Sequence, residues 1–155
     1  MKLAGFTLDE ATGLRIAPGE GIPAGYLDGA EQYLVEGLRG ISDRSVGSEE
    51  LAGLVKDWPT EYHLSPFRTT IVDCLGLTGG SLRVLELGCG CGAITRWLGE
   101  RCAEVHAIEG NAARALAART RCADLPGVEV YVGNFSELDE RDGYDVVTLI
   151  GVLRT

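Results

Sequence analysis

The spacing of apolar residues predicts strands that alternate with helices over residues 59–155. Helical patterns are expected near residues 65–75, 93–101 and 111–120, and short apolar runs are typical of strands at residues 82–87, 104–108, 128–132 and 144–150. Strand–helix repetition with short connections predicts parallel strands joined by right-handed crossovers. The last run is almost wholly apolar, which is typical of a strand covered on both faces of a parallel sheet.

Residues 1–58 carry a different pattern, which predicts a hairpin followed by helices. Residues 6–8 and 14–16 flank a turn that contains glycine. We expect this segment to form a small cap, with a boundary at residue 58, and residues 59–155 to form the second domain.

Two helix starts are predicted inside this N-terminal segment. Asp28 followed three residues later by Glu31 resembles a capping box. Ser48 is expected to cap a second helix, which continues to Trp58 and which Pro59 ends.

The most informative stretch is a strand that ends in three alternating glycines. Glu86 lies near the end of this strand, and Gly88, Gly90 and Gly92 follow it before the next helix begins. Gly88 permits a sharp turn, and Gly90 and Gly92 leave room for a ligand against the backbone. The helix N-terminus offers free amide groups. Glu109 closes the second strand, where an acidic residue accepts hydrogen bonds from ribose hydroxyls. The unit therefore predicts a site for an adenosine-containing ligand.

Glu86 separates two kinds of adenosine ligand. Gly88, Gly90 and Ala93 also satisfy the dinucleotide fingerprint, so an NAD(P)-dependent oxidoreductase is an alternative function. The carboxylate of Glu86 opposes a pyrophosphate and favours a cation. S-adenosylmethionine carries a sulfonium and an ammonium group and no phosphate, so it suits this site better.

Four motifs in order resemble those of class I S-adenosylmethionine-dependent methyltransferases, in particular bacterial members. The motifs are residues 84–92 (VLELGCGCG), 105–110 (VHAIEG), 130–135 (VYVGNF) and 144–153 (YDVVTLIGVL), preceded by a similar lead-in at residues 62–68. The resemblance covers about residues 60–153. It implies an α/β fold with a Rossmann-like, doubly wound parallel sheet, of which this chain contains the first four strands beside the N-terminal hairpin and helical segment.

The resemblance implies S-adenosyl-L-methionine as cofactor. It also implies a cofactor-binding set that comprises Glu86, Gly88, Cys89, Gly90, Gly92, Glu109, Gly110, Asn111, Asn134, Phe135 and Ile150. In this set Glu86 and the glycine turn hold the methionine end, Glu109 takes the ribose hydroxyls, and the carbonyl of Asn134 accepts from the adenine amino group.

No catalytic residue is identified from the sequence. His63 is a candidate base and Tyr62 a candidate cover for the methionine end. No metal site is expected. Arg114, Arg119 and Arg121 are interpreted as the solvated face of a helix.

Net charge and cysteine content limit which binding partners and which cellular compartment we expect. The chain has 23 acidic and 14 basic residues, a net charge of −9, which predicts a small-molecule acceptor and no nucleic-acid or membrane partner. Five cysteines do not form a disulfide framework, and the N-terminus does not resemble a secretory signal. These features predict a cytoplasmic location.

The resemblance also implies three further strands that this chain does not contain. We expect a chain truncated after its fourth strand, since Thr155 follows that strand closely. The apolar fourth strand would then be an edge, which favours a homo-oligomer or a partner chain that covers it. A non-catalytic module that binds the cofactor is therefore a second alternative function.

Overall fold

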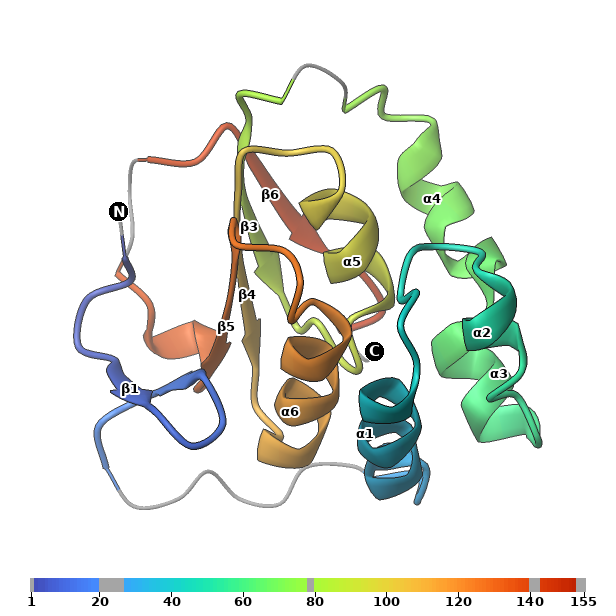
Figure 1. Ribbon diagram of the computed structural model, residues 1–155. Helices are drawn as coiled ribbons and strands as arrows, with labels where there is room; N and C mark the ends of the chain where they lie inside the picture. The colour runs from blue at the N-terminus through green and yellow to red at the C-terminus, as the bar shows by residue number, and fades with distance from the viewer. Residues whose placement is uncertain (1, 20–26, 78–79, 140–142, 153–155) are drawn as a thin grey trace.

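A six-stranded sheet forms the centre of the part of the chain that the computed structural model describes, which is residues 2–19, 27–77, 80–139 and 143–152 (Figure 1). The strands are β1 (Thr7–Asp9), β2 (Leu14–Ile16), β3 (Arg83–Leu87), β4 (Glu104–Glu109), β5 (Val128–Val132) and β6 (Val146–Leu149). Their order in the sheet is β1-β2-β5-β4-β3-β6. Only the β1–β2 pair is antiparallel, and the other four pairs are parallel.

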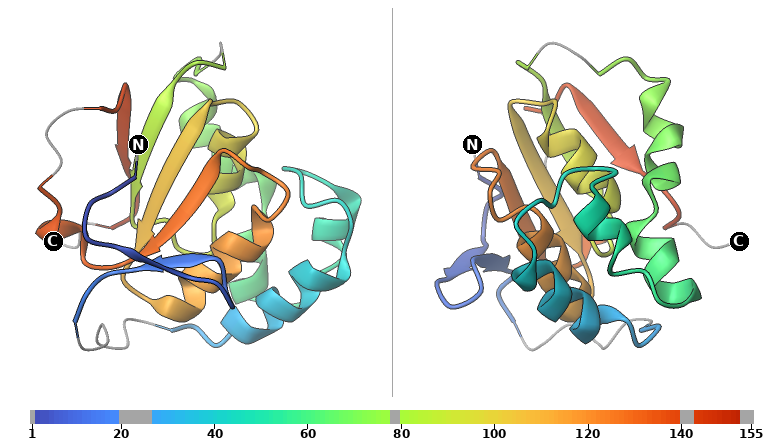
Figure 2. Two further views of the ribbon diagram at one scale, coloured as in Figure 1. Left: turned by 60° about the vertical axis from the view of Figure 1, so that its left-hand side comes forward. Right: turned by 45° about the vertical axis from the view of Figure 1, so that its right-hand side comes forward.

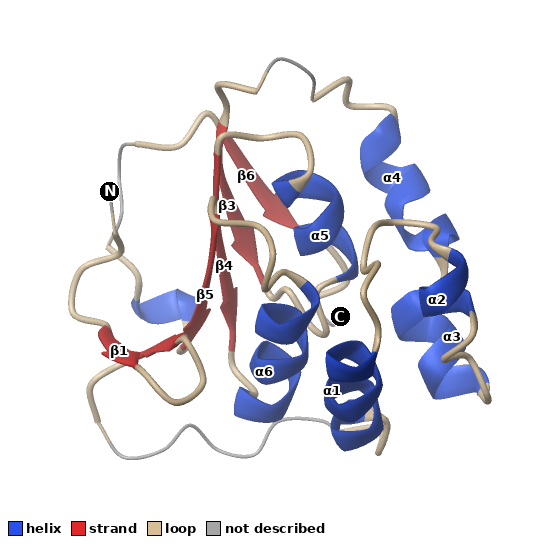
Figure 3. Cartoon of the chain, viewed as in Figure 1, coloured by secondary structure: helices blue, strands red, loops and turns tan. Residues whose placement is uncertain are grey.

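The described helices lie on one side of this sheet (Figures 1 and 3). They are α1 (Glu31–Gly40), α2 (Glu49–Ala52), α3 (Trp58–Leu64), α4 (Thr70–Asp73), α5 (Ala93–Gly99) and α6 (Ala112–Arg121), with the 3-10 turn η1 (Pro66–Thr69) before α4. A second 3-10 turn, η2 (Phe135–Glu137), follows β5 and lies on the other side of the sheet. Helices α5 and α6 cover the sheet, and α1 packs on the outside of α6 (Figure 2). None of the described helices is both long and apolar enough to span a bilayer.

The predicted fold class, an α/β Rossmann-like parallel sheet, is confirmed, with two differences from the expectation. The sheet has six strands instead of four, because the hairpin joins it: β2 runs parallel to β5 with Arg15 opposite Tyr131. The other face of the sheet carries no α-helix among the described residues. Leu3 and the segment around η2 cover it instead, against Ile108 and Tyr131. The domain boundary at residue 58 stays a prediction.

The apolar strands bury their side chains as their sequences predict, except for β6. Val105 and Val130 of the central strands are fully buried. Strand β6 pairs with β3 alone among the described strands, and its Val147 and Leu149 are 57% and 39% exposed. It is therefore the edge strand in this part of the chain, and Thr155 lies outside the described residues.

The prediction that Pro59 ends a helix is wrong. Ser48 does cap α2, as expected, but α2 has only four residues, and a new helix begins at Trp58. Asp57 and Thr60 form the capping box of that helix, α3, in which Pro59 occupies the first turn. A proline there lacks only an N–H group that has no partner within the helix. Pro59 therefore marks the start of a helix and not its end.

The start of α1 also differs in detail from the expectation. Its N-cap residue is Ala30, whose N–H donates to Asp28 Oδ1 at 3.1 Å. The carboxylate of Glu31 accepts from the amides of Asp28 and Gly29 at 3.2 and 3.1 Å. The expected pairing of Asp28 with Glu31 therefore exists, but it precedes the helix and fixes the loop before it.

We expect Leu34→Ala in α1 to lower the free energy of unfolding by about 2–5 kcal/mol, because Leu34 is fully buried and the substitution leaves a cavity. Leu75→Ala is the matched control, since Leu75 is 52% exposed and should change this free energy by about 0.5 kcal/mol or less. Urea unfolding followed by circular dichroism measures both. Equal losses in the two variants would contradict the placement of α1 against α6.

Candidate functional site

A cavity of about 870 Å³ opens at the carboxyl ends of the parallel strands β3, β4, β5 and β6, and residues 16–19 at the end of the parallel strand β2 also line it. The loops that follow these strands line it, together with Tyr62 and His63 of α3. Every residue of the predicted cofactor-binding set lies at this cavity except Gly92. Parallel strands bring their following loops to one edge of the sheet, which is the usual ligand site of such folds.

The three glycines of the turn have different structural roles. All three have positive φ, and a side chain on Gly88 would collide with Val152. A Cβ on Gly92 would lie 2.7 Å from the Cα of Ala118, so Gly92 allows α6 to approach the turn and does not face the cavity. A Cβ on Gly90 would meet nothing within 4 Å and would occupy cavity space. Gly90 is therefore the glycine that leaves room for a ligand.

The amides of this turn are already hydrogen-bonded inside the protein. The N–H groups of Gly88 and Cys89 donate to the Ile108 carbonyl at 2.8 and 3.1 Å. The N–H of Gly92 donates to the Cys89 carbonyl at 3.0 Å, and that of Gly90 donates to a side-chain carboxylate at 2.8 Å. These four groups therefore cannot cradle a phosphate. The amides that the sequence predicts to be free belong to the N-terminus of α5, which begins one residue later at Ala93.

Glu86 brings a buried carboxyl group to the cavity. Its Oε2 accepts a hydrogen bond of 2.6 Å from the hydroxyl of Thr95, and its side chain is 5% exposed. Burial raises the pKa of Glu86 to about 7, the Thr95 hydrogen bond opposes this rise, and the nearby charge of Glu109 adds to it. Oε1 accepts no hydrogen bond from the described residues and reaches the cavity that Glu86 lines. A cation placed there would stabilise the ionised form.

Glu109 is held by backbone amides on both sides. Its Oε2 accepts from Gly90 N–H at 2.8 Å, and its Oε1 accepts from Asn111 N–H at 3.0 Å. Asn111 in turn caps α6 through its own side chain. Each carboxylate oxygen can accept a second hydrogen bond, so Glu109 keeps acceptor capacity toward the cavity.

Asn134 follows β5 and caps η2. Its Oδ1 accepts from the N–H and the hydroxyl of Ser136 at 3.1 and 2.8 Å. The resemblance implies that this same oxygen accepts from the adenine amino group. In the structure the side-chain amide NH₂ of Asn134 is the group without a hydrogen-bond partner among the described residues.

Helix α3 supplies the second wall of the cavity. The ring of Tyr62 stacks on Trp58, with 5.6 Å between ring centroids, and the guanidinium carbon of Arg68 lies 4.2 Å from the Tyr62 centroid. His63 is 5% exposed, and its Nε2 lies 2.7 Å from Asp28 Oδ2.

Two arginines that the sequence places on a solvated helix face are not solvated in this way: Arg121 is buried and Arg114 is half-buried. The side chain of Arg114 is 17% exposed, lines the cavity and pairs with Asp28 and Glu31. Arg121 is 2% exposed and donates to the carbonyl of His63 at 2.8 Å. That prediction is wrong because α1 and α3 pack over this face of α6. The helix-start pattern of Asp28 and Glu31 shows in the sequence that two carboxylates lie close together, but it does not reveal that Arg114 pairs with them.

The comparisons with known proteins agree with this geometry. A family model described as "Methyltransferase domain" matches residues 84–155. Ribosomal RNA small subunit methyltransferase A of Geobacter metallireducens is 40% identical over 60 residues, which are 39% of this chain and 22% of that protein. This chain thus spans about a fifth of the length of the curated relative.

Two solved structures are also similar. Phosphoethanolamine N-methyltransferase 1 of Haemonchus contortus, solved with phosphoethanolamine and S-adenosylhomocysteine, has a TM-score of 0.50 at 15% identity, over 76% of this chain and 24% of that one. A dimethyladenosine transferase of Plasmodium falciparum has a TM-score of 0.48 at 25% identity, over 54% of this chain and 30% of that one. The first of these supports the fold alone.

One sequence prediction is corrected by these comparisons. The prediction of no nucleic-acid partner is wrong as an exclusion, because the Geobacter protein is named for ribosomal RNA. The net charge of −9 is a sum over the chain and does not describe the cavity, which Arg68 and Arg114 also line. The comparisons do not establish a small-molecule acceptor, because the phosphoethanolamine methyltransferase is only 15% identical to this chain.

The family match and the strand–glycine–helix geometry concern the same residues. The match begins within β3 and includes the glycine turn, Glu109 and the loop after β5. Residues 84–155 of this chain therefore match the methyltransferase-domain family model over the same segments that carry the motifs resembling class I S-adenosylmethionine-dependent methyltransferases.

Proposed function

We propose that this chain binds S-adenosylmethionine in the cavity at the carboxyl ends of its parallel strands and takes part in methyl transfer. The observation that carries the proposal is the buried carboxyl group of Glu86 at the glycine turn, with one oxygen open to the cavity. A ligand with an ammonium and a sulfonium group gains from this charge, whereas a pyrophosphate is repelled by it.

The hydrogen bonds of the turn support the same choice of ligand. The amides of Gly88, Cys89, Gly90 and Gly92 donate within the protein. These four amides are therefore not available to a phosphate group of a dinucleotide, which would be left with the amides at the N-terminus of α5. This argues against the oxidoreductase alternative.

The remaining roles follow the order of the loops. Glu109, with acceptor capacity to spare, would take the ribose hydroxyls. Gly110 and Asn111 would lie along the adenine, Phe135 would pack on the ring, and the NH₂ group of Asn134 would donate to a ring nitrogen. Ile150 would lie beside the transferring methyl group.

The bound cofactor supplies an activated methyl group. The protein therefore needs mainly to position donor and acceptor and to exclude water. Cavity walls from four strand ends and from α3 suit that task. A cytoplasmic location and a bacterial origin stay predictions from the sequence.

We expect Glu109→Gln to weaken the binding of S-adenosylhomocysteine by about 1–3 kcal/mol, or about 5- to 150-fold, because a carboxylate acceptor of the ribose hydroxyls is lost. Glutamine is chosen over alanine because its carbonyl can still accept from the amide of Gly90 or Asn111 and support the turn. Isothermal titration calorimetry measures the affinity.

The control for this experiment is Glu36→Gln, which removes the same charge from an exposed position of α1. It should bind S-adenosylhomocysteine as the wild type does. Equal affinities of Glu109→Gln and wild type would contradict the ribose assignment, and a wild type that does not bind would overturn the proposed function.

We expect binding of S-adenosylhomocysteine to release protons near pH 7. The pKa of Glu86 in the free protein is about 7, and a bound ammonium group would lower it. At pH 7 about half of the free molecules are protonated at Glu86 and the bound molecules are ionised, so affinity should rise as the pH increases from 6 to 8. Calorimetry in two buffers of different ionisation enthalpy measures the released protons. In Glu86→Gln the release and the rise in affinity should both disappear, and their persistence would show that another group is responsible.

A further inference from the structure

The wall of the cavity on the side of α3 contains an Asp–His pair that the cofactor site does not use. His63 lines the cavity, while Asp28 lies behind it and is not among the described residues that face the cavity. The pair is nearly inaccessible to solvent, with side chains 5% and 6% exposed. A buried pair of this kind at a cavity wall is a candidate for proton transfer.

The hydrogen bonds decide which nitrogen of His63 carries the proton. Asp28 Oδ2 lies 2.7 Å from Nε2 of His63 and also accepts from the guanidinium of Arg114 at 3.2 Å. An ionised carboxylate can only accept, so Nε2 must be the N–H donor of the ring. The neutral ring then has its lone pair at Nδ1.

Nδ1 is open to the cavity. It has no hydrogen-bond partner among the described residues. The unpartnered atoms that solvent cannot reach do not include it, so it is accessible. Since His63 lines the cavity, that lone pair is available to a group inside it.

The charged groups around the pair keep His63 neutral and Asp28 ionised. Burial lowers the pKa of His63 below 6.5, and the hydrogen bond and charge of Asp28 only partly oppose this, while Arg114 adds to the lowering and Glu31 opposes it. Burial by itself would raise the pKa of Asp28, but the hydrogen bonds from His63 and Ala30 lower it below its usual value.

Four other described groups lie near His63 and Asp28. Cys91 of the glycine turn packs in one cluster with Leu64, and burial raises the pKa of its thiol to about 12, so it stays neutral. The Tyr62 ring stands edge-on to the imidazole, with 5.2 Å between ring centroids. The guanidinium of Arg121 donates to the backbone carbonyl of His63 and not to its ring. Glu31, the other nearby carboxylate, pairs with Arg114 at 3.2 Å.

We propose that His63 is the general base of the methyl transfer, that Asp28 and Arg114 position it, and that the acceptor atom is a phenolic or enolic hydroxyl oxygen. This inference rests on the proposed function. As the acceptor oxygen forms its bond to the methyl carbon, Nδ1 of His63 takes the hydroxyl proton. The carbon–sulfur bond breaks and its electron pair stays on sulfur, which leaves a neutral thioether and an imidazolium that Asp28 stabilises.

The need for a base is what selects the hydroxyl. A neutral amine attacks with its own lone pair and loses its proton afterwards, and a thiol with a pKa near 8.5 is partly ionised at neutral pH. A phenol with a pKa near 10 is almost fully protonated there, so it gains most from a base. A base of this kind typically contributes about 10²- to 10⁴-fold in rate.

The tautomer can be tested without any acceptor. The chain has only two histidines, so an ¹⁵N imidazole spectrum contains two rings, and His63→Gln assigns them. We expect His63 to be neutral at pH 7 with its proton on Nε2, and Asp28→Asn to allow the other tautomer. A wild-type ring protonated on Nδ1 alone would overturn the proposal.

The reaction is tested with two probe acceptors and S-adenosylmethionine. Unsubstituted phenol needs a base at pH 7, whereas 2,4-dinitrophenol, which is fully ionised at that pH, does not. We expect His63→Gln to slow methylation of phenol by 100-fold or more at pH 7 and of the dinitrophenolate by less than threefold. The loss with phenol should shrink as the pH rises toward the pKa of phenol.

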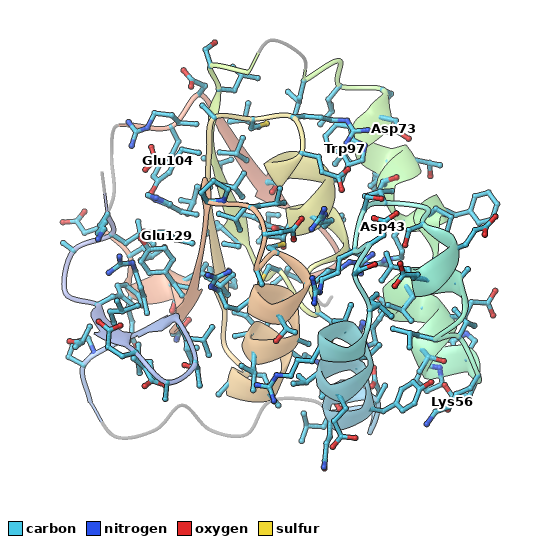
Figure 4. The ribbon with its side chains drawn as sticks, viewed as in Figure 1. Asp43, Lys56, Asp73, Trp97, Glu104 and Glu129 are labelled. Carbon is cyan, nitrogen blue, oxygen red and sulfur yellow. The ribbon has the colours of Figure 1, made fainter. Side chains whose placement is uncertain are left out.

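His106→Gln is the matched control. His106 is fully buried on the other face of the sheet, near Glu104 and Glu129 (Figure 4). Its Nδ1 lies 2.6 Å from the Tyr144 hydroxyl, and it does not line the cavity. With folding checked by thermal unfolding, this variant should methylate both probes in the wild-type ratio.

Each outcome separates this inference from the proposed function. A protein that does not bind S-adenosylhomocysteine overturns both. A wild type that binds it and methylates neither probe overturns the hydroxyl acceptor alone. A His63→Gln variant with the wild-type ratio of rates and the wild-type pH profile overturns the role of His63, while the cofactor site stands.

Discussion

The carboxylate of Glu109 holds together the two loops on which the site depends. One oxygen accepts from Gly90 in the turn after β3, and the other accepts from Asn111 at the start of α6. Two charge-assisted hydrogen bonds thus fix the glycine turn relative to the next strand and helix. Because Gly92 lets α6 approach within van der Waals distance, the same contact also sets the position of the helix that carries Arg114.

The cavity therefore has two chemically different walls. On the side of the sheet, Glu86 is buried with one oxygen open, and its pKa near 7 makes its charge respond to a cation. On the side of α3, burial keeps the pKa of His63 below its usual value, although the ionised Asp28 opposes this, so the ring is neutral. A buried carboxylate with a partner keeps its charge, and one without a partner takes up a proton more readily. The walls thus offer a site for positive charge and a separate acceptor for a proton.

The helices and strands were predictable where a short stretch of sequence decides them. The strands β3, β4 and β5 have apolar runs bounded by glycine or polar residues, and Asn111 caps α6 as its position indicates. The same local rules gave the wrong role to Pro59, because a proline can stand at either end of a helix. They also placed Arg114 and Arg121 in solvent, since the pattern of one helix does not record what packs on it.

What the sequence by itself determined is the strand–glycine–helix unit and the two carboxylates, Glu86 and Glu109, that follow from parallel strands ending at one edge. What only the tertiary structure decided is the wall of the cavity on the side of α3, with His63 and Asp28. Asp28 meets His63 across 35 positions and Arg114 across 86, and the hairpin joins β5 from the start of the chain. Such pairings depend on how α1 and α3 pack over α6. Packing is set by the shapes and burial of many residues at once, and local periodicity does not encode it.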